Sequence, residues 1–125
     1  MRELILIFVG GGLGSITRFS LGKWITSLHS QNFPYATLAV NVIACFVLGL
    51  VIGLAEHKQI ISAPSRLFWA VGFCGGFSTF STFSAETITL IQTGFHLSGV
   101  LYIIASLVLC LAATLAGLYL GENIS

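Results

Sequence analysis

Charged side chains are scarce in this chain of 125 residues, because Asp, Glu, Lys and Arg together make up only 7% of it. A soluble domain typically carries about 25% charged residues, so the composition argues against a protein whose main solvent is water. The formal net charge is +1, and no cluster of Lys and Arg occurs. The lack of a basic cluster excludes a nucleic-acid partner and a polybasic lipid anchor.

Motifs of catalysis and of metal binding are also missing. The chain contains no G-x-S-x-G, no H-E-x-x-H and no P-loop. Its histidines, His29, His57 and His96, stand at the ends of apolar segments, while its cysteines lie inside such segments and form no C-x-x-C pair. The cysteines are Cys45, Cys74 and Cys110. We therefore expect a protein that is not an enzyme and whose cysteines are free, packed thiols.

Long apolar segments account for most of the chain, of which 56% is hydrophobic. One helical crossing of a hydrocarbon core about 30 Å thick needs about 20 mostly apolar residues. Four segments meet this requirement, at about 4–28, 35–55, 66–95 and 97–120. The sequence predicts an all-α membrane protein with one transmembrane domain, residues 1–125. Because three comparable segments follow the first, we interpret the first as a transmembrane helix and not as a cleaved signal peptide.

The third segment is too long for one straight crossing, because 30 residues at a rise of about 1.5 Å would extend for about 45 Å. Gly75 and Gly76 are followed by Phe77–Ser84, which holds five hydroxyls and three phenylalanines. We expect this helix to break near its middle. A break would direct freed N–H groups and the positive end of the downstream half-helix at one place, where an anion is stabilised, and freed carbonyls would equally suit a cation.

Small residues and a weak charge bias both bear on assembly. Each segment carries one G-x-x-x-G pair, which indicates closely packed helices: Gly10 and Gly14, Gly49 and Gly53, Gly72 and Gly76, Gly117 and Gly121. Arg2, Lys58 and Arg66 fall on the N-terminal side of the predicted bundle and Lys23 near the other side. This slight bias permits insertion in both orientations, and therefore an antiparallel homodimer.

Two polar residues lie where lipid is expected. A central charge costs about 2.5–3.5 kcal/mol on insertion scales, yet Arg18 occurs within the first segment. Its guanidinium either snorkels toward the interface or faces a vestibule in which it concentrates anions. Asn41 lies near the middle of the second segment, one turn after Thr37. Its amide either joins two helices or offers its N–H donors to an anion.

The fourth segment has a polar stripe at every fourth position, made of Ser98, Tyr102, Ser106, Cys110 and Thr114. We interpret the stripe as a track of hydrogen-bond donors, although each hydroxyl can instead bond to a carbonyl of its own helix. In the third segment, Phe80 and Phe83 share one helical face, where they either pack in a core or present positive ring edges to a small anion. Glu86 is the only carboxylate within a membrane segment.

The run Gly75-Gly76-Phe77-Ser78-Thr79-Phe80-Ser81-Thr82-Phe83-Ser84 closely resembles the signature of the Fluc, or CrcB, fluoride channels. The resemblance extends to Gly11–Gly14 with Arg18 and to Thr37–Asn41. It implies an antiparallel, dual-topology homodimer with two fluoride pores. It also implies a structural sodium ion at the dimer centre, held by backbone carbonyls at the positions of Gly75 and Ser78.

The same resemblance implies roles for individual residues. Phe80 and Phe83 would present ring edges to fluoride, and Asn41 would line a vestibule. The remaining residues of the implied polar path, or beside it, are Ser81, Thr82, Ser106, Thr114, Glu86 and Tyr102. Two positions depart from the usual pattern: Cys110 stands where a serine is frequent, and Ala44 where a glycine is usual. A thiol is a weaker donor than a hydroxyl, so we expect slower or differently gated conduction.

These observations predict a passive, fluoride-selective channel in the bacterial cytoplasmic membrane that exports cytoplasmic fluoride and confers fluoride resistance. The expected partners are fluoride, the lipid bilayer and a second copy of the chain. One alternative is an exporter of the small multidrug-resistance type, but that class depends on a carboxylate in its first helix, where this chain has Arg18. Another alternative is an accessory membrane subunit, in which the hydroxyl stripe would only join helices.

Overall fold

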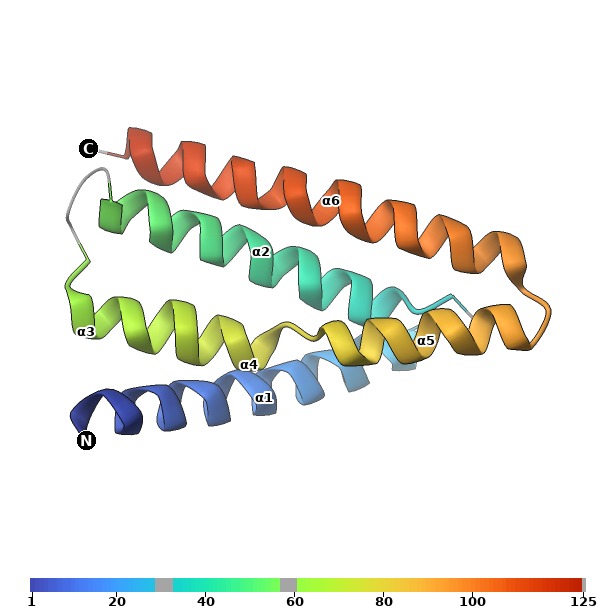
Figure 1. Ribbon diagram of the computed structural model, residues 1–125, viewed down its shortest axis with the longest axis horizontal. Coiled ribbons are helices and arrows are strands. Elements are labelled where there is room, and N and C mark those ends of the chain that lie inside the picture. The colour runs from blue at the N-terminus through green and yellow to red at the C-terminus, as the bar shows by residue number, and fades with distance from the viewer. Residues whose placement is uncertain (29–32, 57–60, 125) are drawn as a thin grey trace.

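The computed structural model describes residues 1–28, 33–56 and 61–124, and the elements of this part of the chain are all helices. The first segment is α1 (Arg2–Leu28), the second α2 (Tyr35–Glu56) and the last α6 (His96–Asn123). Figure 1 shows the segments lying side by side with alternating directions and with both termini at one end. As a result, α2 and α6 run parallel. His29, His57 and Lys58 lie outside the described residues.

The third segment is divided, as the sequence predicted. Its elements are α3 (Ala63–Arg66), the π-helical η1 (Leu67–Cys74), α4 (Gly75–Phe77) and α5 (Phe80–Gln92). Gly75 and Gly76 remain helical, and the break falls at Ser78 and Thr79, whose backbones are extended at φ −84°, ψ 158° and φ −150°, ψ 116°. The wider turns of η1 were not predicted, because a π-helix leaves no distinct pattern in the sequence.

Caps and a glycine turn fix the ends of these elements. The Ser62 hydroxyl accepts a hydrogen bond from the Ser65 N–H at the start of α3, and Pro64 occupies the first turn, where its missing N–H costs nothing. Between α5 and α6, Gly94 has φ 94°, a conformation that a residue with a side chain rarely adopts. The chain therefore reverses direction within a few residues and brings α6 alongside α5.

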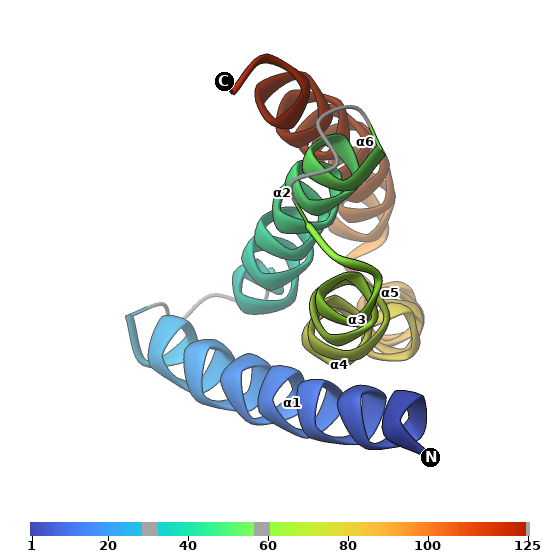
Figure 2. The ribbon, with the colours of Figure 1, turned by 90° about the vertical axis from the view of Figure 1, so that its left-hand side faces the viewer.

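Glycines bring the helix backbones into contact, as the G-x-x-x-G pairs predicted. A Cβ atom on Gly14 of α1 would lie 2.2 Å from the Phe73 carbonyl oxygen, and one on Gly49 of α2 would lie 2.2 Å from that of Thr114 on α6. Figure 2 shows the result, with α1 against α3 and α4 on one side and the α2–α6 pair on the other. Only residues without a side chain permit these approaches.

The contacts between α2 and α6 define a register. A Cβ atom on Gly53 would lie 3.1 Å from the Cα atom of Gly121, so these two glycines face each other where the helices are closest. Three polar pairs follow along the two helices: Cys45 with Cys110 and Asn41 with Ser106 line one cavity, and Thr37 and Tyr102 bond to the same Glu86 side chain. Each of these pairs lies one turn further toward the N-terminal ends of the two helices. The parallel pair therefore places two polar series opposite each other.

The outer surface of the bundle is apolar. Three helices, α1, α2 and α6, are long and apolar enough to cross a membrane, and only 11%, 28% and 17% of their most apolar windows are buried within the chain. Large side chains such as Phe8, Leu111 and Leu115 are more than 60% exposed. The divided third segment extends beside these helices (Figure 1). A surface of this kind is stable in lipid, so the protein is a multi-pass membrane protein.

Candidate functional site

Asn41 of α2 holds the break in the third segment. Its Oδ1 accepts a hydrogen bond from the Thr79 N–H at 2.8 Å, and its Nδ2 donates one to the Thr79 carbonyl at 3.0 Å. The amide thus supplies both partners that the backbone of Thr79 would otherwise find within a helix. The structure therefore shows that the Asn41 amide joins two elements, which is one of its two interpretations. The two bonds use only one of the two N–H groups of the amide.

Thr79 also caps the downstream half-helix. Its Oγ1 accepts a hydrogen bond from the Thr82 N–H at 3.2 Å and donates one to the Thr82 hydroxyl at 3.0 Å. The Ser78 hydroxyl donates to the Cys74 carbonyl at 2.8 Å. The hydroxyls of Ser78, Thr79 and Thr82 are therefore bonded within the break. The N-terminus of α5, where partial positive charge accumulates, begins next to Asn41.

The break leaves the carbonyls of Gly75 and Ser78 without their usual helical donors. The Thr79 N–H, which would bond to the Gly75 carbonyl, donates to Asn41, and the Thr82 N–H, which would bond to the Ser78 carbonyl, donates to Thr79 Oγ1. Carbonyl oxygens in this state are the ligands that hard cations prefer. A Cβ on Gly75 would meet nothing within 4 Å, so this backbone is open on its outer side.

Arg18 of α1 reaches the end of the upstream half-helix. Its Nε donates a hydrogen bond to the Gly76 carbonyl at 3.0 Å, where the helix dipole is negative. The half-buried Arg18 also lines a cavity of about 210 Å³ together with Thr82 and Glu86. The Nε of Arg18 is therefore held at the break, beside this cavity.

A second cavity, of about 250 Å³, lies between the break and α6. It is lined by Asn41, Cys45, Ser78, Thr79, Phe80, Phe83, Ser106, Leu107, Cys110 and Leu111. The Phe80 and Phe83 rings are 5.4 Å apart between centroids and tilted by 46°. Ser106 is 7% exposed, and its hydroxyl has no hydrogen-bond partner among the described residues. A buried hydroxyl without a partner is costly, and Ser106 places such a hydroxyl in the wall of this cavity.

Glu86 of α5 connects α2 and α6. The Thr37 hydroxyl donates to its Oε2 at 3.0 Å, and the Tyr102 hydroxyl donates to its Oε1 at 2.9 Å. Tyr102 is fully buried, and its ring contacts Phe83 with 5.0 Å between centroids. The carboxylate is therefore held rigidly beside the rings. The sequence did not predict that Thr37 bonds to Glu86, although Thr37 lies one turn before Asn41 and therefore shares its helical face.

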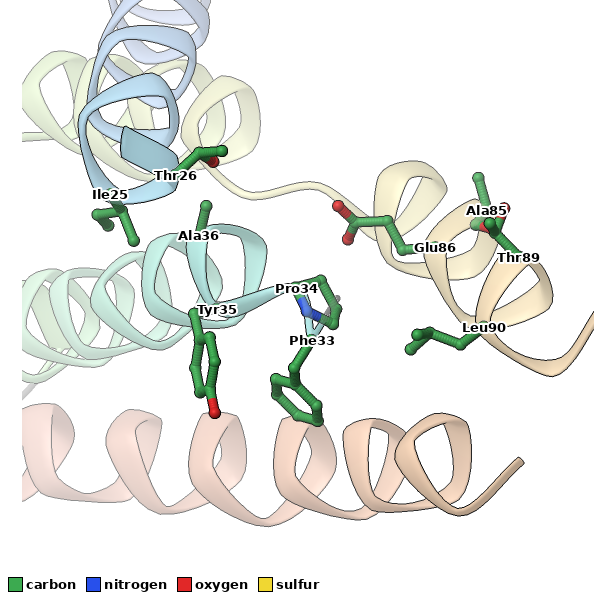
Figure 3. Close-up of a pocket in the computed structure, with 10 residues that line it drawn as sticks. All are labelled: Ile25, Thr26, Phe33, Pro34, Tyr35, Ala36, Ala85, Glu86, Thr89 and Leu90. Carbon is green, nitrogen blue, oxygen red and sulfur yellow. The ribbon is translucent and has the colours of Figure 1, made fainter. Parts of the chain in front are cut away.

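An open cavity of about 340 Å³ lies on the other side of Glu86. Figure 3 shows the Glu86 carboxylate directed between Thr26 of α1 and the start of α2, with the Phe33 and Tyr35 rings along the wall next to α6. Because Glu86 also lines the cavity that contains Arg18, the two spaces adjoin at this carboxylate. Together they form a polar approach to the break from the end of the bundle where α1 ends and α2 begins.

Three residues that were predicted to line the ion path do not line the cavity between the break and α6. Thr82 lines the cavity of Arg18. Ser81 is exposed, with its hydroxyl 3.4 Å from that of Thr79. The Thr114 hydroxyl donates to the Cys110 carbonyl of its own helix at 3.0 Å. Three hydroxyls of the α6 stripe therefore differ in their partners. Tyr102 bonds to Glu86, Ser106 has no partner among the described residues, and Thr114 bonds to its own helix.

Comparison with known proteins places this architecture in a family. Residues 5–118 match the family model described as CrcB-like protein, Camphor Resistance (CrcB). The chain is 41% identical over 124 residues to the fluoride-specific ion channel FluC of Agrobacterium fabrum, with 99% of each chain covered. It is 44% identical over 118 residues to the FluC of Rhizobium etli strain ATCC 51251, with 94% of each covered. It is 40% identical over 122 residues to that of Phocaeicola vulgatus, with 98% of this chain and 100% of the relative covered.

These matches extend over the break, both half-helices and the facing residues of α2 and α6. The family model matches residues 5–118, and the relative from Agrobacterium fabrum is 41% identical over 99% of the chain. The chain belongs to the CrcB family.

Proposed function

We propose that the protein is a passive, fluoride-selective ion channel. It exports cytoplasmic fluoride through the bacterial cytoplasmic membrane and thereby confers fluoride resistance. The names of the relatives support this proposal, since fluoride-specific ion channels match the chain at 40% identity or more over at least 94% of its length. The helices that are long and apolar enough to span a membrane support it as well, because an ion channel must cross the bilayer.

The cavity between the break and α6 is the observation that carries the proposal. It combines an unbonded Ser106 hydroxyl, the remaining N–H of Asn41 and the Phe80 and Phe83 rings. Hydroxyl and amide donors replace water around a small anion, and ring edges, which carry positive partial charge, contact the anion without trapping it. Conduction requires binding of this kind, strong enough for entry and weak enough for release.

The two adjoining cavities at Glu86 attract the ion and position it before the break. Arg18 supplies positive potential at the Gly76 carbonyl, and a charged cavity wall raises the local concentration of counter-ions. Glu86, held by Thr37 and Tyr102, fixes the position of the Phe83 ring beside the path. Ser81, Thr82 and Thr114 are assigned to the wider polar surface that the ion passes.

The functional unit is an antiparallel, dual-topology homodimer with two pores. Phe80 is 76% exposed, and the hydroxyl residues Ser81 and Ser84 beside it are exposed as well. Polar groups that face hydrocarbon are unfavourable, which supports a second chain that covers this face. A partner in the opposite orientation meets the same face of the break and completes the wall of each pore.

The carbonyls of Gly75 and Ser78, which the break deprives of their helical donors, would hold a structural sodium ion at the centre of this dimer, together with the same carbonyls of the second chain. Oxygen donors of this type suit a hard cation. A sodium ion held there would supply a positive charge that offsets the negative ends of the two upstream half-helices.

Fluoride efflux from liposomes tests the proposal. Purified protein is reconstituted, and fluoride and chloride efflux are measured in parallel, with Phe80→Ile as the matched variant. The proposal predicts rapid efflux of fluoride, none of chloride, and loss of efflux in the variant while the dimer persists in detergent. Efflux of neither ion from a well-folded dimer would overturn it.

A further inference from the structure

Two thiols face each other across the conduction cavity. Cys45 comes from α2 and Cys110 from α6, and both line the cavity of about 250 Å³ that holds Phe80 and Ser106. Gly49 lies one turn after Cys45, and a Cβ atom there would lie 2.2 Å from the carbonyl oxygen of Thr114, one turn after Cys110, so the two backbones touch beside the cysteines. The helix pair thus fixes the distance between the two cysteines.

The thiols are also free. Cys45 and Cys110 line the same cavity from two neighbouring helices, and both cysteines are unpaired by disulfides. Each is partly exposed, and the wall that they share opens on the cavity. A pair of sulfur atoms from two rigid elements, facing one polar space, is preorganised for a ligand that binds both.

We propose that Cys45 and Cys110 form a binding site for a soft, thiophilic cation that takes two sulfur ligands in a linear arrangement, for which Hg²⁺ is the probe. Binding breaks both S–H bonds, releases two protons to water and forms two Hg–S bonds. The thiolate is the ligand form of cysteine, and proton release accompanies the coordination of a metal by thiols.

Charge balance selects a divalent ion. Two thiolates and one Hg²⁺ give a neutral bridge, so no net charge is added within the membrane, where an uncompensated charge is costly. A site of two sulfurs does not suit Zn²⁺, which takes four ligands in structural sites. Among the described residues, no group of three or more His, Cys, Asp or Glu side chains is placed to hold such an ion.

Cys74 provides the matched control. It lies on η1, is 3% exposed and lines a separate cavity of about 120 Å³, to which Cys45 also contributes. Cys74 does not line the cavity of about 250 Å³ that Cys45 and Cys110 share. The site therefore requires Cys45 and Cys110, and Cys74 is dispensable.

Mercury binding to the purified full-length protein in detergent tests the site without any measurement of transport. Hg²⁺ is titrated in competition with a monothiol, and the sulfur-to-mercury absorbance and the remaining free thiols are recorded. The wild type and Cys74→Ser should each bind one Hg²⁺ per chain. Cys45→Ser and Cys110→Ser should bind at least about 100-fold more weakly, because two-point attachment commonly strengthens binding by about 10²–10⁴.

Two results would overturn the assignment: unchanged binding in Cys110→Ser, or loss of binding in Cys74→Ser. Cys110→Ala serves as a second variant if serine alters folding, and the elution volume of the dimer verifies folding in each case. Retained mercury binding in a folded Cys110→Ala would likewise contradict the pair.

The consequence for transport depends on the proposed fluoride conduction. A mercury bridge in the cavity blocks the path beside Phe80, so Hg²⁺ should stop fluoride efflux from wild-type liposomes, and dithiothreitol should restore it. Efflux through Cys110→Ser should be insensitive to Hg²⁺. Undiminished wild-type efflux with mercury bound would contradict the block, whereas the absence of any fluoride efflux would count against the channel and leave the binding result standing.

Discussion

Asn41 bonds both backbone groups of Thr79, accepting from its N–H at 2.8 Å and donating to its carbonyl at 3.0 Å. One amide on α2 thereby replaces, for one residue of the third segment, the partners that a continuous helix would provide. The position at which α5 begins is therefore set by α2. This coupling gives Asn41 a role in shaping the break in addition to its place in the cavity wall.

Replacing Asn41 by alanine should weaken both the fold and the transport. The variant leaves the N–H and the carbonyl of Thr79 unsatisfied, and each buried polar group in that state costs about 1–3 kcal/mol. We expect a lower midpoint of thermal unfolding in detergent and loss of fluoride efflux. Full efflux at unchanged stability would contradict the role assigned to this amide.

The two hydrogen bonds to Glu86 should be energetically coupled. Tyr102→Phe and Thr37→Val each remove one donor to the carboxyl group, and each should lower the free energy of unfolding by about 1–3 kcal/mol, because one oxygen of Glu86 loses its partner. Because both donors act on one carboxylate, the double variant should deviate from additivity. Chemical denaturation of the four proteins measures this deviation, and strict additivity would show that the bonds are independent.

Gly49→Ala should separate α2 from α6. The added methyl would lie 2.2 Å from the Thr114 carbonyl oxygen, an overlap with backbone atoms that cannot be relieved by a change of rotamer. Overpacking of this kind costs about 1–3 kcal/mol or more. Gly12→Ala is the control, because its methyl would meet nothing within 4 Å and alanine favours a helix by about 1 kcal/mol. Equal thermal stability of the two variants would contradict the tight packing.

Ser106→Ala and Thr114→Ala should separate the two kinds of hydroxyl on α6. Ser106 is buried in the cavity wall without a hydrogen-bond partner among the described residues, whereas Thr114 bonds to its own helix. Ser106→Ala should therefore keep or raise stability while lowering fluoride efflux by about tenfold, equivalent to about 1.4 kcal/mol in the barrier. Thr114→Ala should leave efflux within a factor of about two, well below that change. A larger loss of efflux in Thr114→Ala than in Ser106→Ala would place the ion path along Thr114 and not along Ser106.

Much of the architecture was predictable because its causes are local. The excess length of residues 66–95 and the hydroxyls after Gly76 predicted the break, which the structure places at Ser78 and Thr79. The G-x-x-x-G pairs predicted close helices, and the backbone approach at Gly49 confirms this. Spacing along one segment determines which residues share a face, so periodicity and composition were sufficient for these features.

The partners of the polar side chains were not predictable. Tyr102, Ser106 and Thr114 occupy equivalent positions on one stripe, yet they bond to Glu86, to none of the described residues, and to their own helix, respectively. Arg18 had two open interpretations until its bond to the Gly76 carbonyl was seen. Each outcome depends on which group of another segment stands opposite, and that group can be tens of residues away in the sequence.

The sequence by itself determined the solvent, the number of long apolar segments, the divided third segment and the family resemblance, because burial energy and helical periodicity act along one stretch of chain. Only the tertiary structure decided that α2 and α6 run parallel with Gly53 facing Gly121, which brings Asn41 and Cys45 to one cavity with Ser106 and Cys110. The physical reason is that register is fixed where two backbones touch at Gly49. A pattern within either helix alone does not contain that contact.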